Sequence, residues 1–184
     1  MTAQGKKALV LVTDFGVEEP ELLRPVDDLK KAGIDVTVAS DSGDTIQTVT
    51  GDKDWASTVE PDTSLDAVSA DDFDILVLPG GTVNADTLRG NAKAQALLQA
   101  MSRAGKPIAA VCHAPWAFID AGLAEGKTLT SYTSVKIDLE NAGATWVDEQ
   151  VKRCPANGWV AITSRNPGDL DAFDQAIVDE LAHG

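Results

Sequence analysis

The feature that most constrains the fold of this chain is an alternation of short apolar runs with longer amphipathic stretches. Residues 8–13 and 74–78 have the length and apolar content of buried strands, whereas residues 20–32 repeat apolar side chains at helical spacing and stop at a glycine. Strands separated by helix-length crossovers are typical of a parallel sheet covered by helices. The pattern therefore predicts an α/β sandwich of three layers with a mainly parallel sheet.

The same alternation continues along the chain. Pro25 lies inside the first helical stretch, and we expect it to kink this helix or to limit its first turn. Residues 41–66 are rich in Asp, Thr and Gly and predict short antiparallel strands or a loop excursion. Further strands are expected at 34–39, 107–111, 127–130, 146–151 and 159–163, and further helices at 92–104, 115–121, 135–142 and 170–181.

Length and net charge limit the kinds of function that this chain could have. The chain has 184 residues with no visible repeat or linker, which predicts a single domain over 1–184. Its 29 acidic and 15 basic residues give a formal net charge of −14, so binding to nucleic acid or anionic lipid is disfavoured. Its apolar runs are far shorter than the ~20 residues of a membrane span. Without a signal-peptide-like start, a cytoplasmic location is expected.

Neither cofactor nor metal is expected from the motifs. No Cys/His cluster has metal-ligand spacing, and the two cysteines are interpreted as free thiols. No G-x-G-x-x-G follows the first strand, so a dinucleotide site has no support. Residues 122–128 are one residue short of a phosphate loop and precede a strand, and we interpret them as a helix stop.

Cys112 is the strongest candidate for chemistry, because it directly follows an apolar strand and precedes a helix that Pro115 opens. A sharp strand-to-helix turn exposes a nucleophile at the sheet edge, and a helix N-terminus favours thiolate and lowers the thiol pKa. The alternative is a buried cysteine that only packs, and these residues alone do not decide between the two. Cys154 is expected in a loop and is not the expected nucleophile.

His113 adjoins this cysteine and could act as base or charge partner. Since neighbouring side chains point in different directions, a carboxylate would be needed to orient its ring. Glu18, Glu19 and Glu21 follow the first strand at the same predicted sheet edge. They could equally do no more than stabilise a helix N-terminus.

Two further features lie near the predicted elbow. Gly80 and Gly81 follow a buried strand and could let backbone N–H groups approach a ligand oxygen, although a plain tight turn explains them as well. Trp116 follows the elbow in sequence and could line a pocket or belong to the core.

Together these segments resemble the PfpI-like family, in the superfamily of the parkinsonism-associated protein deglycase and the class I glutamine amidotransferase domains. The matching segments are EEPEL around Glu21, LVLPGG ending at Gly81 and AVCHAP around Cys112. The resemblance extends over essentially the whole chain. It implies a flavodoxin-like fold, a reactive Cys112, a protonated Glu21 bonded to its sulfur, and oxyanion-binding positions at Gly81 and the His113 N–H.

The resemblance also implies homodimers or higher homo-oligomers in which a neighbouring subunit supplies an acid to His113. Asp86 is the best match for that acid, despite a length difference of about one residue and Asp in place of Glu. A solvated loop acid near Thr87 is the alternative interpretation. Ala114 also replaces the glycine that many PfpI-type members have after Cys-His.

Family resemblance implies a cysteine-dependent stress-protection enzyme. As a glyoxalase or deglycase, the enzyme would act on methylglyoxal or another small aldehyde, or on a glycated adduct. Otherwise the enzyme would be an intracellular cysteine peptidase. The alternative is a redox-sensing or chaperone-like stress protein with an oxidisable Cys112 and little turnover.

Overall fold

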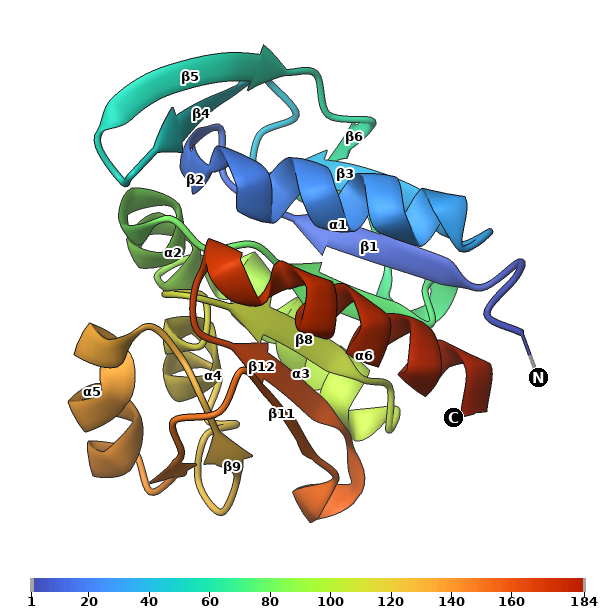
Figure 1. Cartoon of the computed structure of the whole chain (residues 1–184). Coiled ribbons are helices and arrows are strands. Elements are labelled where there is room, and N and C mark those ends of the chain that lie inside the picture. Colours follow the sequence, from blue (N-terminus) through green and yellow to red (C-terminus); the bar gives the residue numbers. More distant parts are fainter. Residues whose placement is uncertain (1, 184) are drawn as a thin grey trace.

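The structure is a computed structural model that describes residues 2–183 (Figure 1). Its strands are β1 (Lys7–Leu11), β2 (Phe15–Glu18), β3 (Asp35–Ser40), β4 (Ile46–Thr50), β5 (Asp54–Val59), β6 (Thr63–Ser64), β7 (Ile75–Leu78), β8 (Ile108–Val111), β9 (Thr128–Leu129), β10 (Thr145–Trp146), β11 (Val151–Cys154) and β12 (Ala161–Ser164). Its helices are α1 (Glu19–Lys31), α2 (Thr82–Arg89), α3 (Ala92–Arg103), α4 (Trp116–Asp120), α5 (Lys136–Asn141) and α6 (Leu170–His183).

The central sheet confirms the predicted fold class. Its strands have the order β11-β12-β8-β7-β1-β3-β6. Only β11, at one edge, runs antiparallel to its neighbour, and the other neighbouring pairs are parallel. Helices α1 and α6 lie side by side on one face, and α3 and α4 lie behind the sheet on the other (Figure 1). The result is the expected three-layer arrangement.

The apolar strands are explained by burial on both faces. In β1, Ala8 and Val10 belong to the core that packs against α1 and α6, whereas Leu9 and Leu11 belong to the core on the α3 and α4 side. Each of these side chains is at most 1% exposed. Because both faces are covered, a central parallel strand carries apolar residues at successive positions instead of alternating ones. Burial of each leucine contributes roughly 1.5–3 kcal/mol.

A small second sheet, with the order β2-β4-β5, stands beside the main one. The antiparallel pair β4 and β5 confirms the short strands expected within residues 41–66. Strand β2 was not expected, and it pairs with β4 in parallel. Helix α2 was not expected either. Both unexpected elements follow directly after central strands, and their sequences lack a clear apolar period.

Pro25 does not limit the first helix to its first turn, so that part of the expectation is wrong. Helix α1 is continuous across Pro25, which lies on its buried side, and Pro20 occupies its first turn. The ring removes one helical hydrogen bond, the bond that residue 25 would donate to the carbonyl of Glu21. Packing of the buried face of α1 compensates for this loss.

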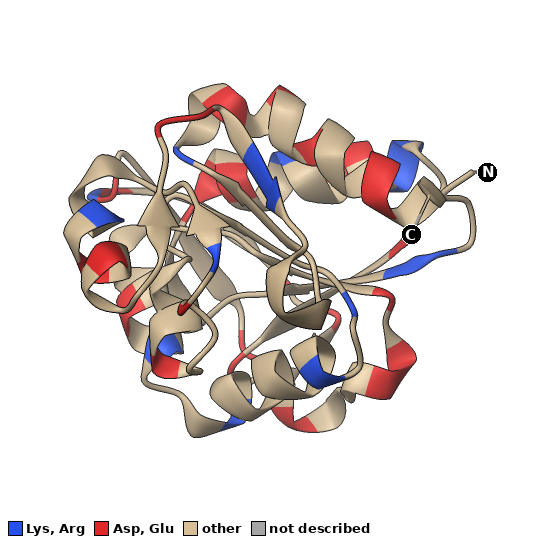
Figure 2. Ribbon diagram, turned by 90° about the horizontal axis from the view of Figure 1, so that it is seen from below, with Lys and Arg blue, Asp and Glu red and all other residues tan. Residues whose placement is uncertain are grey.

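The surface is acidic without a basic patch in view. Figure 2 shows Asp and Glu spread over the helices on both sides of the sheet, with Lys and Arg scattered between them. This distribution agrees with the net charge of −14. Within residues 2–183, no helix combines the length and apolarity that crossing a membrane requires.

Candidate active site

Cys112 lies directly after β8 at the carboxyl edge of the sheet. Its backbone has φ of +64°, in the left-handed region that residues other than glycine rarely adopt. Two hydrogen bonds hold it there: its N–H donates to the Ser164 carbonyl at 3.1 Å, and its carbonyl accepts from the Tyr132 N–H at 2.8 Å. Such a conformation costs about 1–3 kcal/mol and persists where the surroundings enforce it. The strained turn matches the elbow that the sequence suggests.

The electrostatics of the thiol differ from the expectation. Helix α4 has only five residues and begins at Trp116, so the Cys112 sulfur does not lie in the first turn of a long helix. Burial raises the pKa of the Cys112 thiol and the Glu21 carboxylate raises it further, while the Gly81 N–H lowers it. The predicted lowering of the thiol pKa by a helix terminus is therefore wrong. Forming the thiolate requires a nearby proton acceptor.

Glu21 is completely buried in the first turn of α1. Its Oε2 accepts a hydrogen bond from the Gly80 N–H at 2.8 Å. Burial raises the pKa of this carboxyl to about 8, against the lowering effect of hydrogen bonding with Cys112 and Gly80. A pKa of about 8 favours the protonated form of this carboxyl at neutral pH. Its other oxygen, Oε1, has no hydrogen-bond partner by distance and angle within residues 2–183.

The two positions after β7 require glycine because atoms of other segments approach their backbone closely. A Cβ atom on Gly80 would lie 2.4 Å from Glu21 Oε2 and 2.7 Å from the Cys112 Cβ. Gly81 has φ of +84°, and a Cβ there would lie 2.2 Å from the Gly16 carbonyl oxygen. No side chain can replace either hydrogen without moving backbone. The pair therefore brings α1, β7 and the elbow together.

His113 is in contact with the neighbouring thiol. Its Nδ1 lies 3.0 Å from the Cys112 sulfur, so the expectation that the adjacent side chains diverge is wrong. The left-handed turn at Cys112 accounts for this. On the other side of the ring, Nε2 lies 3.3 Å from Thr82 Oγ1 and 3.4 Å from Ser134 Oγ. Burial lowers the pKa of His113, while the carboxylate of Asp52 acts in the opposite direction.

Aromatic rings fix the plane of the imidazole. Tyr132 stacks on His113 with ring centroids 4.5 Å apart, and the Trp116 ring lies at 5.2 Å. The Trp116 Nε1 donates to Asp138 at 2.8 Å, which holds the indole beside the site where the sequence placed it. A cavity of about 450 Å³ adjoins Tyr132 and is also lined by Arg165.

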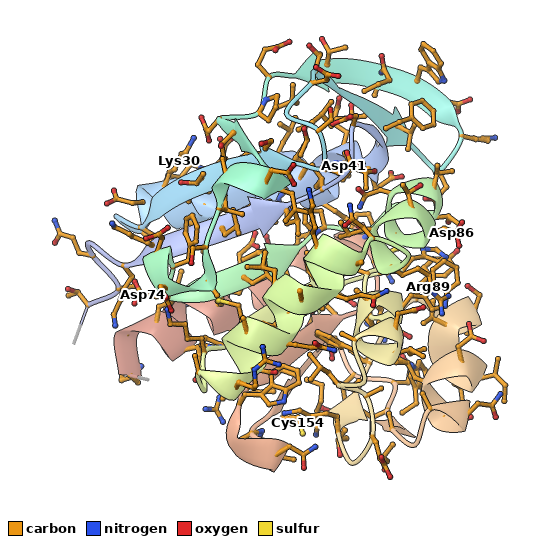
Figure 3. All side chains as sticks on the ribbon, turned by 180° about the vertical axis from the view of Figure 1, so that it is seen from behind. Lys30, Asp41, Asp74, Asp86, Arg89 and Cys154 are labelled. Carbon is orange, nitrogen blue, oxygen red and sulfur yellow. The ribbon has the colours of Figure 1, made fainter. Side chains whose placement is uncertain are left out.

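Asp86 does not meet His113 within this chain. It lies in the middle of α2 and is exposed, so the alternative interpretation as a solvated acid agrees with its exposure, but the residue lies in a helix and not in a loop. Figure 3 shows Asp86 and Arg89 at the outer side of α2. Contact with the histidine of a neighbouring subunit stays a prediction.

Several residues of the site had no signal in the sequence. Asp52 comes from the turn between β4 and β5, 30 residues from Thr82, whose N–H donates to Asp52 Oδ1 at 2.7 Å. Asn84 joins the end of β1 to the glycine turn, because its side chain accepts from the Thr13 N–H at 2.7 Å and donates to the Gly80 carbonyl at 2.9 Å. Thr82 alone could have been suspected, since it follows the glycine pair.

The geometry of the site is compatible with a nucleophile, a base and an acid. Cys112 provides the sulfur, neutral His113 can accept its proton, and protonated Glu21 can donate one. Within residues 2–183, no group of three or more His, Cys, Asp or Glu side chains could hold a metal ion. Fold and site together define an α/β protein with a cysteine at a nucleophile elbow.

Comparison with known proteins agrees with this class. The model of the DJ-1/PfpI family matches residues 6–180. Deglycase PfpI of Pyrococcus furiosus is 38% identical over 89% of this chain and 93% of its own length. General stress protein 18 of Bacillus subtilis is 36% identical, with 93% and 95% covered. The crystal structure of Drosophila melanogaster DJ-1beta superposes with a TM-score of 0.86 and 37% identity, covering all of this chain and 92% of that one. The chain belongs to the DJ-1/PfpI family.

Proposed function

We propose that this protein is a cysteine-dependent stress-protection enzyme that converts methylglyoxal, or adducts of methylglyoxal on amines and thiols, by way of a covalent bond to Cys112. The observation that carries the proposal is the 3.0 Å contact between the Cys112 sulfur and His113 Nδ1, beside a Glu21 carboxyl whose pKa is raised to about 8 by burial. The names of relatives support it, since one is a deglycase and another a general stress protein.

The first step is addition of sulfur to the aldehyde carbon. As the bond forms, the thiol proton passes to His113 Nδ1, which is free to accept it because burial lowers the pKa of the imidazole. The aldehyde oxygen takes a proton from Glu21, which is protonated at neutral pH. The product is a neutral hemithioacetal on Cys112. With an adduct as substrate, the sulfur displaces the amine or thiol from that carbon. The side chain that carried the adduct is released in its unmodified form, with the proton that the Cys112 thiol gave up.

The following steps need no external oxidant. Glu21, now ionised, removes the hydrogen from the carbon bonded to sulfur, and the proton is returned to the neighbouring carbon. The first carbon is thereby oxidised to a thioester while the ketone is reduced to an alcohol. Water then cleaves the thioester to lactic acid, which ionises to lactate, and the free thiol. The proton held by His113 passes back to Glu21 through solvent, which restores the starting site. The overall reaction is the addition of one water molecule to methylglyoxal.

Access to the sulfur favours a small substrate. Cys112 is only 3% exposed and His113 only 4%, so an aldehyde of a few atoms reaches the sulfur more easily than the backbone of an extended peptide. These observations favour glyoxalase or deglycase chemistry over peptide hydrolysis.

The proposal is tested by incubating the full chain with methylglyoxal and following lactate by NMR and protein adducts by peptide mass spectrometry. We expect catalytic formation of lactate, with an adduct trapped on the peptide that contains Cys112. A casein or fluorogenic peptide assay under the same conditions should give no comparable rate. Peptide cleavage without lactate would replace the proposal by the peptidase alternative, and oxidation of Cys112 by peroxide without any turnover would replace it by the sensor.

A further inference from the structure

The turn between β4 and β5 reaches the active site from outside the main sheet. In Figure 1 this turn lies next to the start of α2, above the carboxyl edge of the central strands. Its residue Asp52 is partly buried and adopts φ of +62°. The carboxylate accepts a hydrogen bond from the Thr82 N–H at 2.7 Å. Since Gly81, the residue before α2, has no side chain to cap the helix, Asp52 does so from a distant segment.

A buried carboxylate holds this turn in place. Glu18 is 7% exposed and accepts two backbone hydrogen bonds from the turn, from the Gly51 N–H at 2.9 Å and from the Asp52 N–H at 3.0 Å. Glu18 immediately precedes α1, the helix that carries Glu21. The turn is thus tied both to the helix of the active-site acid and to the helix that starts beside the histidine.

Thr82 connects Asp52 with the imidazole of His113. Its Oγ1 lies 3.3 Å from His113 Nε2, and the opposite ring nitrogen faces the Cys112 sulfur. For Nδ1 to accept the thiol proton, Nε2 must carry the other ring hydrogen and needs an acceptor. The Thr82 hydroxyl can be that acceptor, and a negative charge near it favours the imidazolium that forms when the thiol proton arrives.

We propose that Asp52 is a positioning residue for His113, acting through Thr82, and that this chain thereby supplies from its own β4–β5 turn the carboxylate that the resemblance assigns to a neighbouring subunit. The inference rests on the proposed roles of Cys112 and His113. The electrostatics agree, since the Asp52 carboxylate acts to raise the pKa of His113 against burial, and it also contributes to raising the pKa values of Glu21 and Cys112.

Other groups around the imidazole are neutral or already engaged. Tyr132 stacks on the ring, Trp116 faces it and donates to Asp138, and Ser134 offers a second hydroxyl to Nε2. On the sulfur side lies the protonated Glu21 carboxyl. Asp52 is the ionised group whose charge acts on the imidazole among the residues that the structure describes.

The test measures the titration of His113 directly, by NMR of the full chain labelled with ¹⁵N-histidine. His183, at the exposed end of α6, is the only other histidine and serves as internal reference. Asp52→Asn keeps an oxygen that can accept from the Thr82 N–H but removes the charge. Asp54→Asn is the matched control, because Asp54 is an exposed acid two residues further along the same hairpin.

We expect Asp52→Asn to lower the titration midpoint of His113 by roughly half a pH unit, and to leave His183 unchanged. The control Asp54→Asn should leave both histidines at their wild-type midpoints. An unchanged His113 in Asp52→Asn, an equal shift in Asp54→Asn, or a shift found only in Asp86→Asn would each overturn the proposal. These measurements do not use turnover, so a protein inactive toward methylglyoxal leaves them valid.

A second pair of variants covers the case in which Asp52→Asn does not fold. Thr82→Val removes the hydroxyl and keeps the backbone N–H that Asp52 accepts from, whereas Thr82→Ser retains the hydroxyl. We expect the ¹⁵N shifts of His113 to report a smaller share of the Nε2–H tautomer in Thr82→Val, in which Ser134 still offers a hydroxyl to Nε2, and wild-type values in Thr82→Ser. Identical spectra of the two variants would overturn the proposed path.

Discussion

The two cysteines of this chain are equally buried but chemically different. Cys112 is 3% exposed and Cys154 is 6% exposed. The Cys112 sulfur faces His113 and the Glu21 carboxyl, in a turn with left-handed backbone. The Cys154 sulfur accepts a hydrogen bond from the Thr128 N–H at 3.3 Å. Burial therefore does not distinguish the two cysteines, whereas the groups beside each sulfur that can accept or donate a proton do.

The surroundings of Cys154 show how a charged neighbour can be purely structural. Lys127 is fully buried beside it, and burial lowers the pKa of this lysine to about 8. Its ammonium donates to the backbone carbonyls of Ala156, Trp159 and Cys154, and it lies 3.6 Å from the centroid of the Trp159 ring. These donors are directed at carbonyl oxygens instead of the sulfur. In Figure 3 Cys154 lies near the lower edge of the molecule, whereas Asp86 lies on α2 at the upper right.

The largest expected effect tests the difference between Cys112 and Cys154 directly. Cys112→Ala should lower kcat/KM for methylglyoxal at least about 1,000-fold, because no other group can form the covalent intermediate. Cys154→Ala should change it by less than about threefold, since its sulfur accepts one backbone hydrogen bond far from the reacting atoms. Steady-state kinetics on both variants decide the matter. Full activity of Cys112→Ala together with loss in Cys154→Ala would reverse the assignment.

The crowding around the two cysteines should also differ. Gly81 and Gly126 both have left-handed backbones, with φ of +84° and +74°, but a Cβ on Gly126 would meet nothing nearer than Asn157 Nδ2 at 3.5 Å. Gly126→Ala should therefore cost only the backbone strain, about 1–2 kcal/mol of unfolding free energy. Gly81→Ala should cost more, about 3 kcal/mol or above, because the methyl group would collide with backbone. Denaturant unfolding of both variants measures this, and equal losses would show that the elbow is not more tightly packed.

The last expected effect, the smallest when it is counted per pH unit, is the pH dependence of stability. The pKa of Glu21 is about 8 in the folded chain and near 4.3 when unfolded, so between these values the folded state holds a proton that the unfolded state has lost. Stability should therefore fall as pH rises from about 5 to 8, by up to about 1.4 kcal/mol per pH unit from this group.

Glu21→Gln should remove the contribution of Glu21 to the fall of stability with rising pH. Asp174 is the matched control, because burial raises its pKa to about 7, which gives a slope of the same sign, and it lies on α6 away from the sulfur. Asp174→Asn should leave the Glu21 contribution intact. Denaturant unfolding at several pH values measures both variants. A wild-type slope in Glu21→Gln would mean that this carboxyl is ionised in the folded protein.

The elements that could be predicted from the sequence are those encoded by local patterns of apolar side chains. Apolar runs gave the central strands, helical spacing gave α1, α3 and α6, and the position of Cys112 between a strand and a proline gave the elbow. Glu21 was one of three acids within four residues, and only the family resemblance selected it. Helix α2 was missed because its two turns, Thr82–Arg89, carry no strong apolar period. Cys154 was expected in a loop, although it ends β11, because an edge strand of four residues gives little signal.

By itself, the sequence determined the layers of the fold and the sheet edge at which the chemistry lies, because hydrophobic period and strand direction are local properties. Only the tertiary structure decided that His113 turns back onto its neighbour's sulfur, that Tyr132 stacks on it, and that Asp52 comes to Thr82 from another sheet. These contacts join residues 19 and 30 positions apart or depend on one unusual backbone angle. No local pattern encodes them, because they arise from how whole elements pack against one another.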